Sequence, residues 1–428
     1  MRVGFLIEKW NYYRLFGPIV ERALARGHEA ECWHDLPQLR IGPKATKCPD
    51  MMPSFRHGKP GLRTFQSAAD LAAQLTAGAP DVMVALSRPA GAGDGLRTRW
   101  FGLQYTLDVA SLLTPAGATR FDALGLHSRY WADHVAASLR IIAFNRARGT
   151  GKAPEAVDEA ALAEVVRRRG VVVGTPEMDQ AHWIDPAAVR ARLGLEPERP
   201  VVLYIPFPFN SNPNPFWVRH VYGGGSDVLS RLRVWMHGDA RYREQAARGL
   251  TDRGTVDAVR AFCDANRATL VVKERQKDPA PRYLRGQADL VLDDQEYYPA
   301  TILELLRISS LCLHFFSTVA YEAAYAGVPS LCVAPDLDDL GFPPLWREWF
   351  LNLDEGGSWN FPGVIYPVSL EEVVRELPRR RIADFPLEPA ARAQYVERFV
   401  GFDDGKSSDR VLDVLQSLAE GTPAGGAA

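Results

Sequence analysis

Short apolar runs and helix-like spacings alternate along the chain from its first residues. The run Val3–Ile7 predicts a buried strand, and Pro18–Arg26 carries apolar residues at the i, i+3, i+4 spacing of a helix face. Gly27 is typical of a helix end, and Glu29–Trp33 predicts the next strand. This order indicates a βαβ unit, whose parallel strands are normally covered by helices on both faces.

The alternation continues and then restarts after an interruption. In the first half it predicts strands at Val82–Leu86, Ala123–Leu126 and Val171–Val173, with helices at Ala68–Leu75 and Trp131–Phe144. After a proline-containing stretch it predicts strands at Val201–Ile205, Leu270–Lys273, Leu290–Leu292, Leu311–Phe316 and Ser330–Val333. We therefore expect an α/β chain with Rossmann-like domains at 1–185 and 186–400, followed by a C-terminal helix and disordered tail at 401–428. The spacing does not say which domain the C-terminal helices pack against.

Composition and charge narrow the classes of partner. The chain has 428 residues, 46% of them hydrophobic, which suits two α/β domains. A formal net charge of -2 predicts no nucleic-acid partner. The five cysteines show no CxxC spacing, so we expect buried thiols in a reducing compartment. Without a signal peptide or an apolar run near the roughly 20 residues of a membrane span, the sequence predicts a cytoplasmic protein, with peripheral contact at the inner face of the cell membrane left open.

The segment Leu311–Pro329 is the most informative for chemistry. A buried strand ends at Phe316, Ser317 and Thr318 occupy N-cap positions, and a short helix closes at Gly327. Such a helix start offers unpaired N–H groups, two hydroxyls and a positive dipole end, which together suit a phosphate. An ordinary helix cap is the alternative, and the local pattern favours neither.

Glu322 lies within that short helix. Its carboxylate is placed to accept hydrogen bonds from ribose hydroxyls, and a solvated helix face is the alternative interpretation.

At this segment the sequence resembles a known family. The order strand, Ser-Thr, Glu-Ala and Gly-x-Pro resembles the donor half of GT-B glycosyltransferases, particularly the group of CDP-glycerol glycerophosphotransferases and capsule or teichoic-acid polymer transferases. Gly174–Asp179 resembles the Gly-x-Pro-x-x-Asp that closes their first domain, and Val201–Pro208 resembles the Leu-Tyr-x-Pro strand that follows it. Asp404–Val411 resembles their Asp-Gly-Lys-x-Ser-Glu-Arg-Val. The resemblance spans nearly the whole chain and implies the GT-B fold, two Rossmann-like parallel-sheet domains facing a cleft.

The resemblance also implies a set of donor contacts. The family's basic strand end lines up with Lys273-Glu274-Arg275, where both cations remain and the family's histidine is missing. Two cations at the end of a buried strand suit a phosphate or carboxylate, although an exposed charge cluster is the alternative. The expected donor and phosphate contacts are Lys273, Arg275, Ser317, Thr318, Glu322, Lys406 and Ser407.

The catalytic base does not transfer from the family. Its Trp-His-Gly motif, whose histidine acts as the base, is matched here by Trp100-Phe101-Gly102, and phenylalanine cannot accept a proton. Either the base has moved or the chain belongs to a neighbouring subgroup with another substrate. Transfer with inversion needs a carboxylate or imidazole within reach of the acceptor hydroxyl. The candidates on first-domain loops are Asp108 and Glu8, with His127 third, and a structural role is the alternative for each.

We expect neither a metal nor a separate cofactor. Asp336–Asp338 contains a literal DxD but follows a strand and a proline, which indicates a polar loop. The histidines lack zinc-site spacing. One further group of side chains predicts aromatic packing between domains, with a membrane interface as the alternative: Trp346, Trp349, Phe350, Trp359 and Phe361 near Arg379–Arg381.

The sequence thus predicts a metal-independent, inverting transferase. It would move a sugar or polyol phosphate from a CDP-, CMP- or UDP-linked donor to a hydroxyl of a glycan, lipid-linked or protein acceptor in bacterial surface glycan or glycoconjugate synthesis. Two alternatives remain open, a UDP-sugar 2-epimerase-like enzyme with the same architecture and a non-catalytic binding subunit that keeps the fold.

Overall fold

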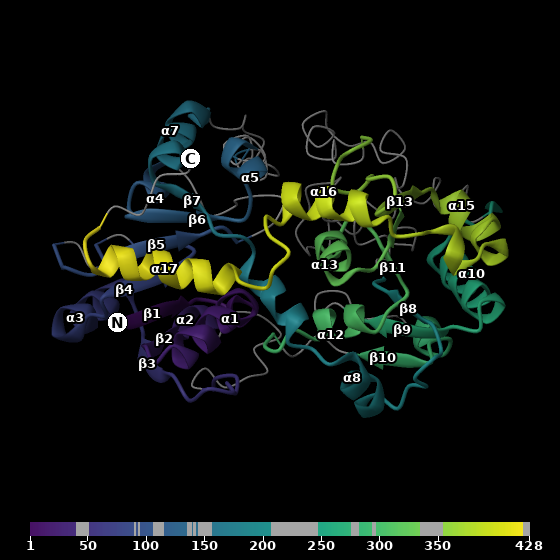
Figure 1. The fold of residues 1–428 in the computed structure, drawn as a ribbon, viewed down its shortest axis with the longest axis horizontal. Coiled ribbons are helices and arrows are strands. Elements are labelled where there is room, and N and C mark those ends of the chain that lie inside the picture. The colour runs from purple at the N-terminus through teal and green to yellow at the C-terminus, as the bar shows by residue number, and fades with distance from the viewer. Residues whose placement is uncertain are drawn as a thin grey trace, which may run out of the picture.

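Two parallel sheets, each flanked by helices, make up the computed structural model of the chain (Figure 1). The strand order is β3-β2-β1-β4-β5-β6-β7 in the first sheet and β10-β9-β8-β11-β12-β13 in the second. The structure describes residues 1–39, 51–89, 91–92, 95–105, 115–134, 139, 143, 156–206, 247–274, 282–292, 297–333 and 354–422.

The first sheet confirms five predicted strands and adds two. Its strands are β1 (Arg2–Ile7), β2 (Glu29–Asp35), β3 (Gly61–Phe65), β4 (Val82–Ala85), β5 (Arg99–Leu103), β6 (Ala123–Leu126) and β7 (Gly170–Val172). Its helices are α1 (Tyr12–Ala25), α2 (Leu36–Leu39), α3 (Ala68–Gly78), α4 (Pro115–Ala118), α5 (Arg129–His134) and α7 (Glu159–Arg169). β3 and β5 lack a continuous apolar run, so the sequence pattern did not reveal them. α1 begins well before its predicted start and includes Pro18.

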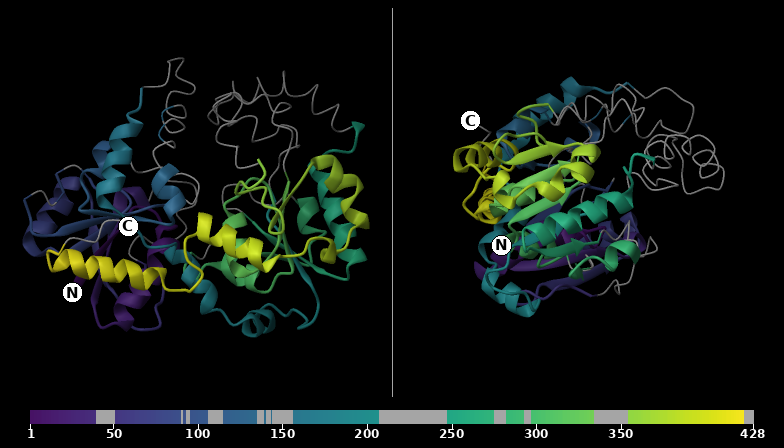
Figure 2. Two further views of the ribbon diagram at one scale, coloured as in Figure 1. Left: turned by 45° about the horizontal axis from the view of Figure 1, so that its top comes forward. Right: turned by 90° about the vertical axis from the view of Figure 1, so that its right-hand side faces the viewer.

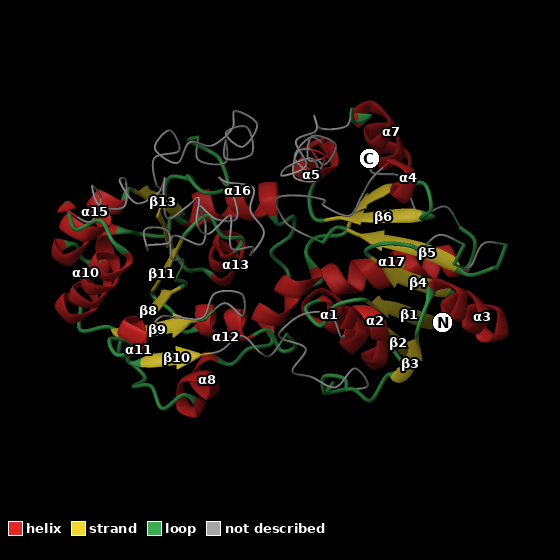
Figure 3. Cartoon of the chain, turned by 180° about the vertical axis from the view of Figure 1, so that it is seen from behind, coloured by secondary structure: helices red, strands yellow, loops and turns green. Residues whose placement is uncertain are grey.

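The second sheet confirms all five of its predicted strands and adds β13. Its strands are β8 (Val201–Tyr204), β9 (Thr269–Lys273), β10 (Leu290–Leu292), β11 (Leu311–His314), β12 (Ser330–Val333) and β13 (Ile365–Val368). The helices around it are α8 (Pro186–Arg192), α10 (Asp252–Ala265), α11 (Arg282–Arg285), α12 (Thr301–Arg307), α13 (Val319–Ala326), α15 (Leu370–Arg375) and α16 (Pro389–Phe399), with short 3-10 turns at Leu377–Arg379 and Ile382–Asp384. Figure 3 shows from behind how helices flank the strands of each sheet.

The C-terminal helices divide between the two sheets. α17 (Ser407–Ala419) returns to the first sheet and packs beside α1 (Figure 1, Figure 2). Its residues Val411, Leu412 and Leu415 belong to the same apolar core as β1 and α1. The opposite face of that sheet packs on α3 and α7. α16 stays with the second sheet and packs against α13. The chain therefore crosses between the sheets twice, first through the 3-10 helix η2 (Pro176–His182) and again between α16 and α17.

The aromatic cluster near residue 360 contributes to the core of the second sheet. Trp359 is 1% exposed and its ring lies 5.4 Å from that of Phe316, while Phe361 meets Tyr395 edge-on at 5.2 Å. Trp346, Trp349 and Phe350 lie outside the described residues. Within the part of the chain that the structure describes, no helix combines the length and apolar character needed to cross a membrane.

Candidate active site between the two domains

Strand order locates the place where each sheet is suited to bind a ligand. In open parallel sheets, ligands bind beyond the carboxyl ends of the strands, where the strand order reverses. The order reverses between β1 and β4 in the first sheet and between β8 and β11 in the second. Glu8 follows β1 directly, and Ser317 and Thr318 follow β11. The structure thus places these predicted residues at the two reversal points.

Glu8 is a half-buried, hydrogen-bonded carboxylate at this edge of the sheet. Both of its oxygens accept from the hydroxyl of Ser87, which follows β4, at 3.0 and 2.8 Å. Burial raises the pKa of Glu8, the Ser87 hydrogen bond lowers it, and the nearby charge of Asp35 raises it further. The hydroxyl of Tyr12 also hydrogen-bonds to Glu8. A carboxylate whose pKa lies above its ordinary value is better matched to proton transfer than an ordinary surface glutamate.

Tyr12, which contacts this carboxylate, packs against a second tyrosine. The ring of Tyr12 meets that of Tyr105 edge-on at 5.5 Å, and Asn11 Nδ2 donates to the Tyr105 hydroxyl. Burial raises the pKa of Tyr105. Neutral phenols and an amide can position the hydroxyl groups of a ligand.

The other predicted bases lie elsewhere. His127 follows β6 and is 1% exposed, and burial lowers its pKa to about 3, so the ring is neutral. Among the described residues neither of its ring nitrogens has a hydrogen-bond partner. Asp108 lies outside the described residues. Phe101, which matches the histidine of the family motif, is fully buried within β5 and packs in the apolar core.

The start of α13 forms the second half of the site. Phe316 adopts a φ of 34°, a conformation that turns the chain sharply between β11 and the helix. Ser317 Oγ accepts from the backbone N–H of Val319 at 3.4 Å. Thr318 is the N-cap residue, but its side chain makes no capping hydrogen bond. Its hydroxyl can therefore turn to a ligand at the positive end of the helix.

Glu322 lies in the first turn of α13 and is buried rather than solvated. Its side chain is 2% exposed and forms an ion pair with Arg14 of α1. Arg14 Nε also contacts Glu177 Oε2 at 3.0 Å. This pairing brings the start of α1, which follows Glu8, next to the start of α13, so the two halves of the site adjoin.

The remaining predicted cations are less closely tied to this site. Lys273 ends β9 at 5% exposure, on the same carboxyl edge as Ser317 and separated from β11 by β8. Glu274 follows and pairs with Arg285. Arg275 lies outside the described residues, as does Asp336–Asp338. Within the described ranges no cluster of side chains suitable for holding a metal ion occurs.

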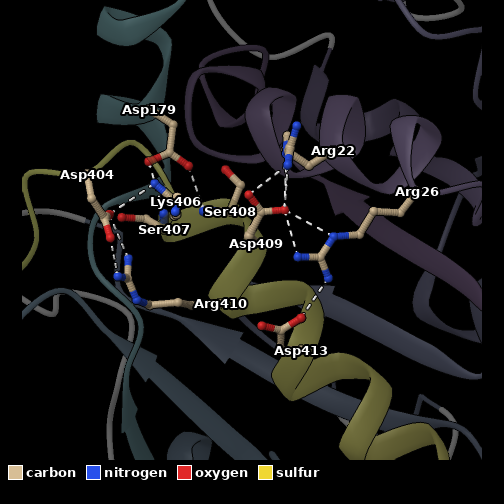
Figure 4. A network of polar contacts seen from close by, with 10 residues as sticks. All are labelled: Arg22, Arg26, Asp179, Asp404, Lys406, Ser407, Ser408, Asp409, Arg410 and Asp413. Carbon is tan, nitrogen blue, oxygen red and sulfur yellow. Dashed lines mark hydrogen bonds and ion pairs between the residues drawn. The ribbon is translucent and has the colours of Figure 1, made fainter.

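Lys406 and Ser407 belong to a contact between the two crossings of the chain (Figure 4). Asp179 of η2 accepts from the backbone N–H of Ser407 at 3.0 Å and of Ser408 at 2.6 Å. Lys406 is exposed, and its backbone N–H donates to Asp404. The N-terminal N–H groups of α17 thus already have an anionic partner. The two motifs of the resemblance that contain Asp179 and Ser407, 228 residues apart, meet here.

The same helix is held to α1 by ion pairs (Figure 4). Asp409 pairs with Arg22 at 2.8 Å and with Arg26 at 2.7 Å, and Arg26 also pairs with Asp413. These contacts fix α17 on the first domain.

Asp179 should make stability depend on pH. Burial raises its pKa from 3.8 to about 6, outweighing the hydrogen bonds from Ser407 and Ser408. The folded chain holds this proton more tightly than the unfolded chain, so the contribution to stability is full below the unfolded pKa and is lost as the pH rises through about 6. Between roughly pH 4.5 and 7.5, Asp179 should lower the free energy of unfolding of the parent chain by about 2 kcal/mol. We expect this decrease to be absent in Asp179→Asn.

Urea unfolding of both chains at the two pH values measures this difference. Asp413→Asn is the matched control, because Asp413 lies on α17, the helix that Asp179 contacts, but its side chain is 66% exposed. An unaltered pH dependence in Asp179→Asn would contradict the prediction.

Comparison with solved structures identifies the fold of the chain. No protein-family model matches the sequence, and no curated protein matches it. Among solved structures, the wall teichoic acid polymerase TagF is similar with a TM-score of 0.56 and 13% identity, over 98% of this chain and 89% of that chain. The UDP-GlcNAc 2-epimerase from Methanocaldococcus jannaschii is similar with a TM-score of 0.51 and 11% identity, over 97% of this chain and 99% of that one. The predicted GT-B fold is thereby confirmed.

Proposed function

We propose that this chain is a GT-B transferase that moves a sugar or polyol phosphate from a nucleotide-activated donor to an acceptor hydroxyl. The observation that carries the proposal is the carboxylate of Glu8, hydrogen-bonded to Ser87 at the strand-order reversal and raised in pKa. The acceptor, a glycan, lipid-linked or protein hydroxyl, would bind on the first domain, and the donor on the second.

The proposed reaction is a single displacement. Glu8 takes the proton of the acceptor hydroxyl while the hydroxyl oxygen attacks the sugar carbon or the phosphorus of the donor. The bond from that atom to the nucleotide breaks, and its electron pair goes to the leaving phosphate. The N–H groups at the start of α13 and the side chain of Lys273 would stabilise that charge, without a metal ion in this proposal. No separate cofactor is needed, since the activated donor is itself a substrate.

The hydroxyls at the start of α13 should contribute to nucleotide affinity. We expect Ser317→Ala combined with Thr318→Ala to raise the Kd for the nucleotide about tenfold, because hydrogen bonds to a charged phosphate are lost. Isothermal titration with nucleoside diphosphates measures the change. Ser309→Ala is the matched control, since its hydroxyl bonds the carbonyl of Leu305 in α12. Equal affinity in the double variant and the parent chain would remove these residues from the site.

A donor panel tests the function itself. The full chain is incubated with CDP-, CMP-, UDP- and GDP-activated donors, with and without EDTA, and binding and slow hydrolysis are followed. We expect at least one CDP-, CMP- or UDP-linked donor to bind and to be hydrolysed, and EDTA to leave the rate unchanged. Binding without any turnover would support a non-catalytic subunit, and the absence of both would overturn the proposal.

One observation favours a second candidate, a UDP-sugar 2-epimerase-like activity. Asp35 ends β2 and so lies at the same carboxyl edge of the sheet as Glu8. Its charge raises the pKa of Glu8. Two neighbouring carboxylates are a suitable pair for removing and returning a proton at a sugar carbon. Conversion of a UDP-sugar to its epimer without any acceptor would establish this alternative, whereas a transferase would at most hydrolyse the donor.

A further inference from the structure

The ion pair between Arg14 and Glu322 joins the first domain to the proposed donor site. Arg14 Nη2 contacts Oε1 of Glu322, and Arg14 Nε contacts Glu177 Oε2 at 3.0 Å. Among the described residues, Arg14 is the ion-pair partner of this carboxylate. A carboxylate can accept more hydrogen bonds than this one pair uses, so Glu322 keeps acceptor capacity for a ligand.

Arg14 is itself fixed by the interface between the domains. Its carbonyl accepts from Gln180 Nε2 at 3.4 Å, and Oε1 of the same glutamine accepts from the N–H of Ala300 at 2.9 Å. Ala300 precedes α12 in the second domain. Arg14 is thus held through both its backbone carbonyl and its guanidinium. A residue fixed in this way is better suited to orient a partner than a mobile surface cation.

Charge gives a second reason for this arrangement. A buried carboxylate that loses its partner is costly, and near a helix start its charge would also repel a phosphate. Arg14 neutralises Glu322, so the positive end of α13 remains suitable for the phosphates of a nucleotide. The pair thus allows a carboxylate and a phosphate site to coexist within one helical turn.

We propose that Arg14 is a positioning residue for the donor nucleotide. It holds Oε1 of Glu322 so that Oε2 accepts a hydrogen bond from the 2′-hydroxyl of the ribose. This inference rests on the proposed function and deepens it, since the donor site on the second domain then needs a residue of the first domain. The ligand class is a ribonucleoside diphosphate, with its deoxyribose counterpart disfavoured.

The experiment compares ribose and deoxyribose ligands in matched variants. CDP, UDP and their 2′-deoxy forms are titrated into the full parent chain, Arg14→Met, Arg14→Lys and Arg22→Met. In the parent we expect the ribonucleotide to bind about tenfold more tightly than the deoxy form, the value of one hydrogen bond to a charged group. Arg14→Met should lose most of this preference, and Arg14→Lys, which keeps the charge, should recover part of it.

Arg22→Met is the control because Arg22 lies on the same helix but pairs with Asp409 of α17. It should retain the full preference. Equal weakening of both ligand forms in Arg14→Met would show a purely structural role and overturn the proposal. If Glu322→Gln abolishes the preference and Arg14→Met keeps it, the inference fails while the proposed function stands. If neither CDP nor UDP binds the parent, the inference fails, and the donor panel decides whether the proposed function fails with it.

Discussion

Replacing Glu8 with glutamine is expected to lower turnover by about 10²- to 10⁴-fold and to leave nucleotide affinity unchanged, because general-base catalysis contributes a factor of that size. Glutamine keeps the shape of the side chain and can still accept from the Ser87 hydroxyl, but it cannot take a proton. The nucleotide in the proposed complex contacts α13, not Glu8. Steady-state rates with the best donor and calorimetric Kd values measure the two quantities separately.

The pH dependence of the same reaction gives an independent check. The Ser87 hydrogen bond lowers the pKa of Glu8, so Ser87→Ala should raise it and move the acid limb of the rate profile to higher pH. Glu164→Gln is the control for Glu8→Gln, since this exposed glutamate pairs with neighbouring arginines of α7. Turnover in Glu8→Gln equal to that of the parent chain would assign the base elsewhere, with Asp108 as the remaining acidic candidate.

The sequence pattern was sufficient for the architecture because burial on both faces leaves a clear signal. Strands such as β6 and β12 are fully buried and were predicted with their correct bounds. β3 and β13 lie at sheet edges, where half-exposed positions weaken the apolar run, and both escaped prediction. β10 is also a half-buried edge strand, but its three residues are all apolar and it was predicted, so the sequence signal is the unbroken apolar run.

The residues of the candidate site that could be predicted lie at, or in the helix just after, the end of a recognisable strand. Glu8 and Ser317 could be proposed in this way, because their strands are clear and ligands bind at strand ends. Ser87 and Arg14 could not, since their roles depend on strand order and on contact between domains. Ser87 becomes significant only once β4 is known to lie beside β1, and no local pattern pairs Arg14 with Glu322.

The second crossing of the chain, between α16 and α17, packs closely against the backbone of the first crossing. Thr175 Oγ1 donates to the carbonyl of Val400 at 3.0 Å, and Gly401 follows with a φ of 108°. A Cβ on Gly401 would overlap the carbonyl oxygen of His127 and crowd the backbone of Gly174. Three segments distant in the sequence therefore approach each other here as closely as glycine permits.

We expect Gly401→Ala to lower the free energy of unfolding by about 4 kcal/mol, the sum of backbone strain at this φ and overpacking against two rigid backbones. Gly27→Ala is the matched control, because Gly27 also has a positive φ, 74°, but nothing lies within 4 Å of its added Cβ. That variant carries strain alone and should lose about 1 kcal/mol. Urea unfolding measures both, and similar losses in the two variants would contradict the close approach of the crossings.

The two crossings of the chain set how the domains meet. If Arg14 acts on Glu322 across the interface, Gly401→Ala should therefore also weaken nucleotide binding, whereas Gly27→Ala should leave it unchanged.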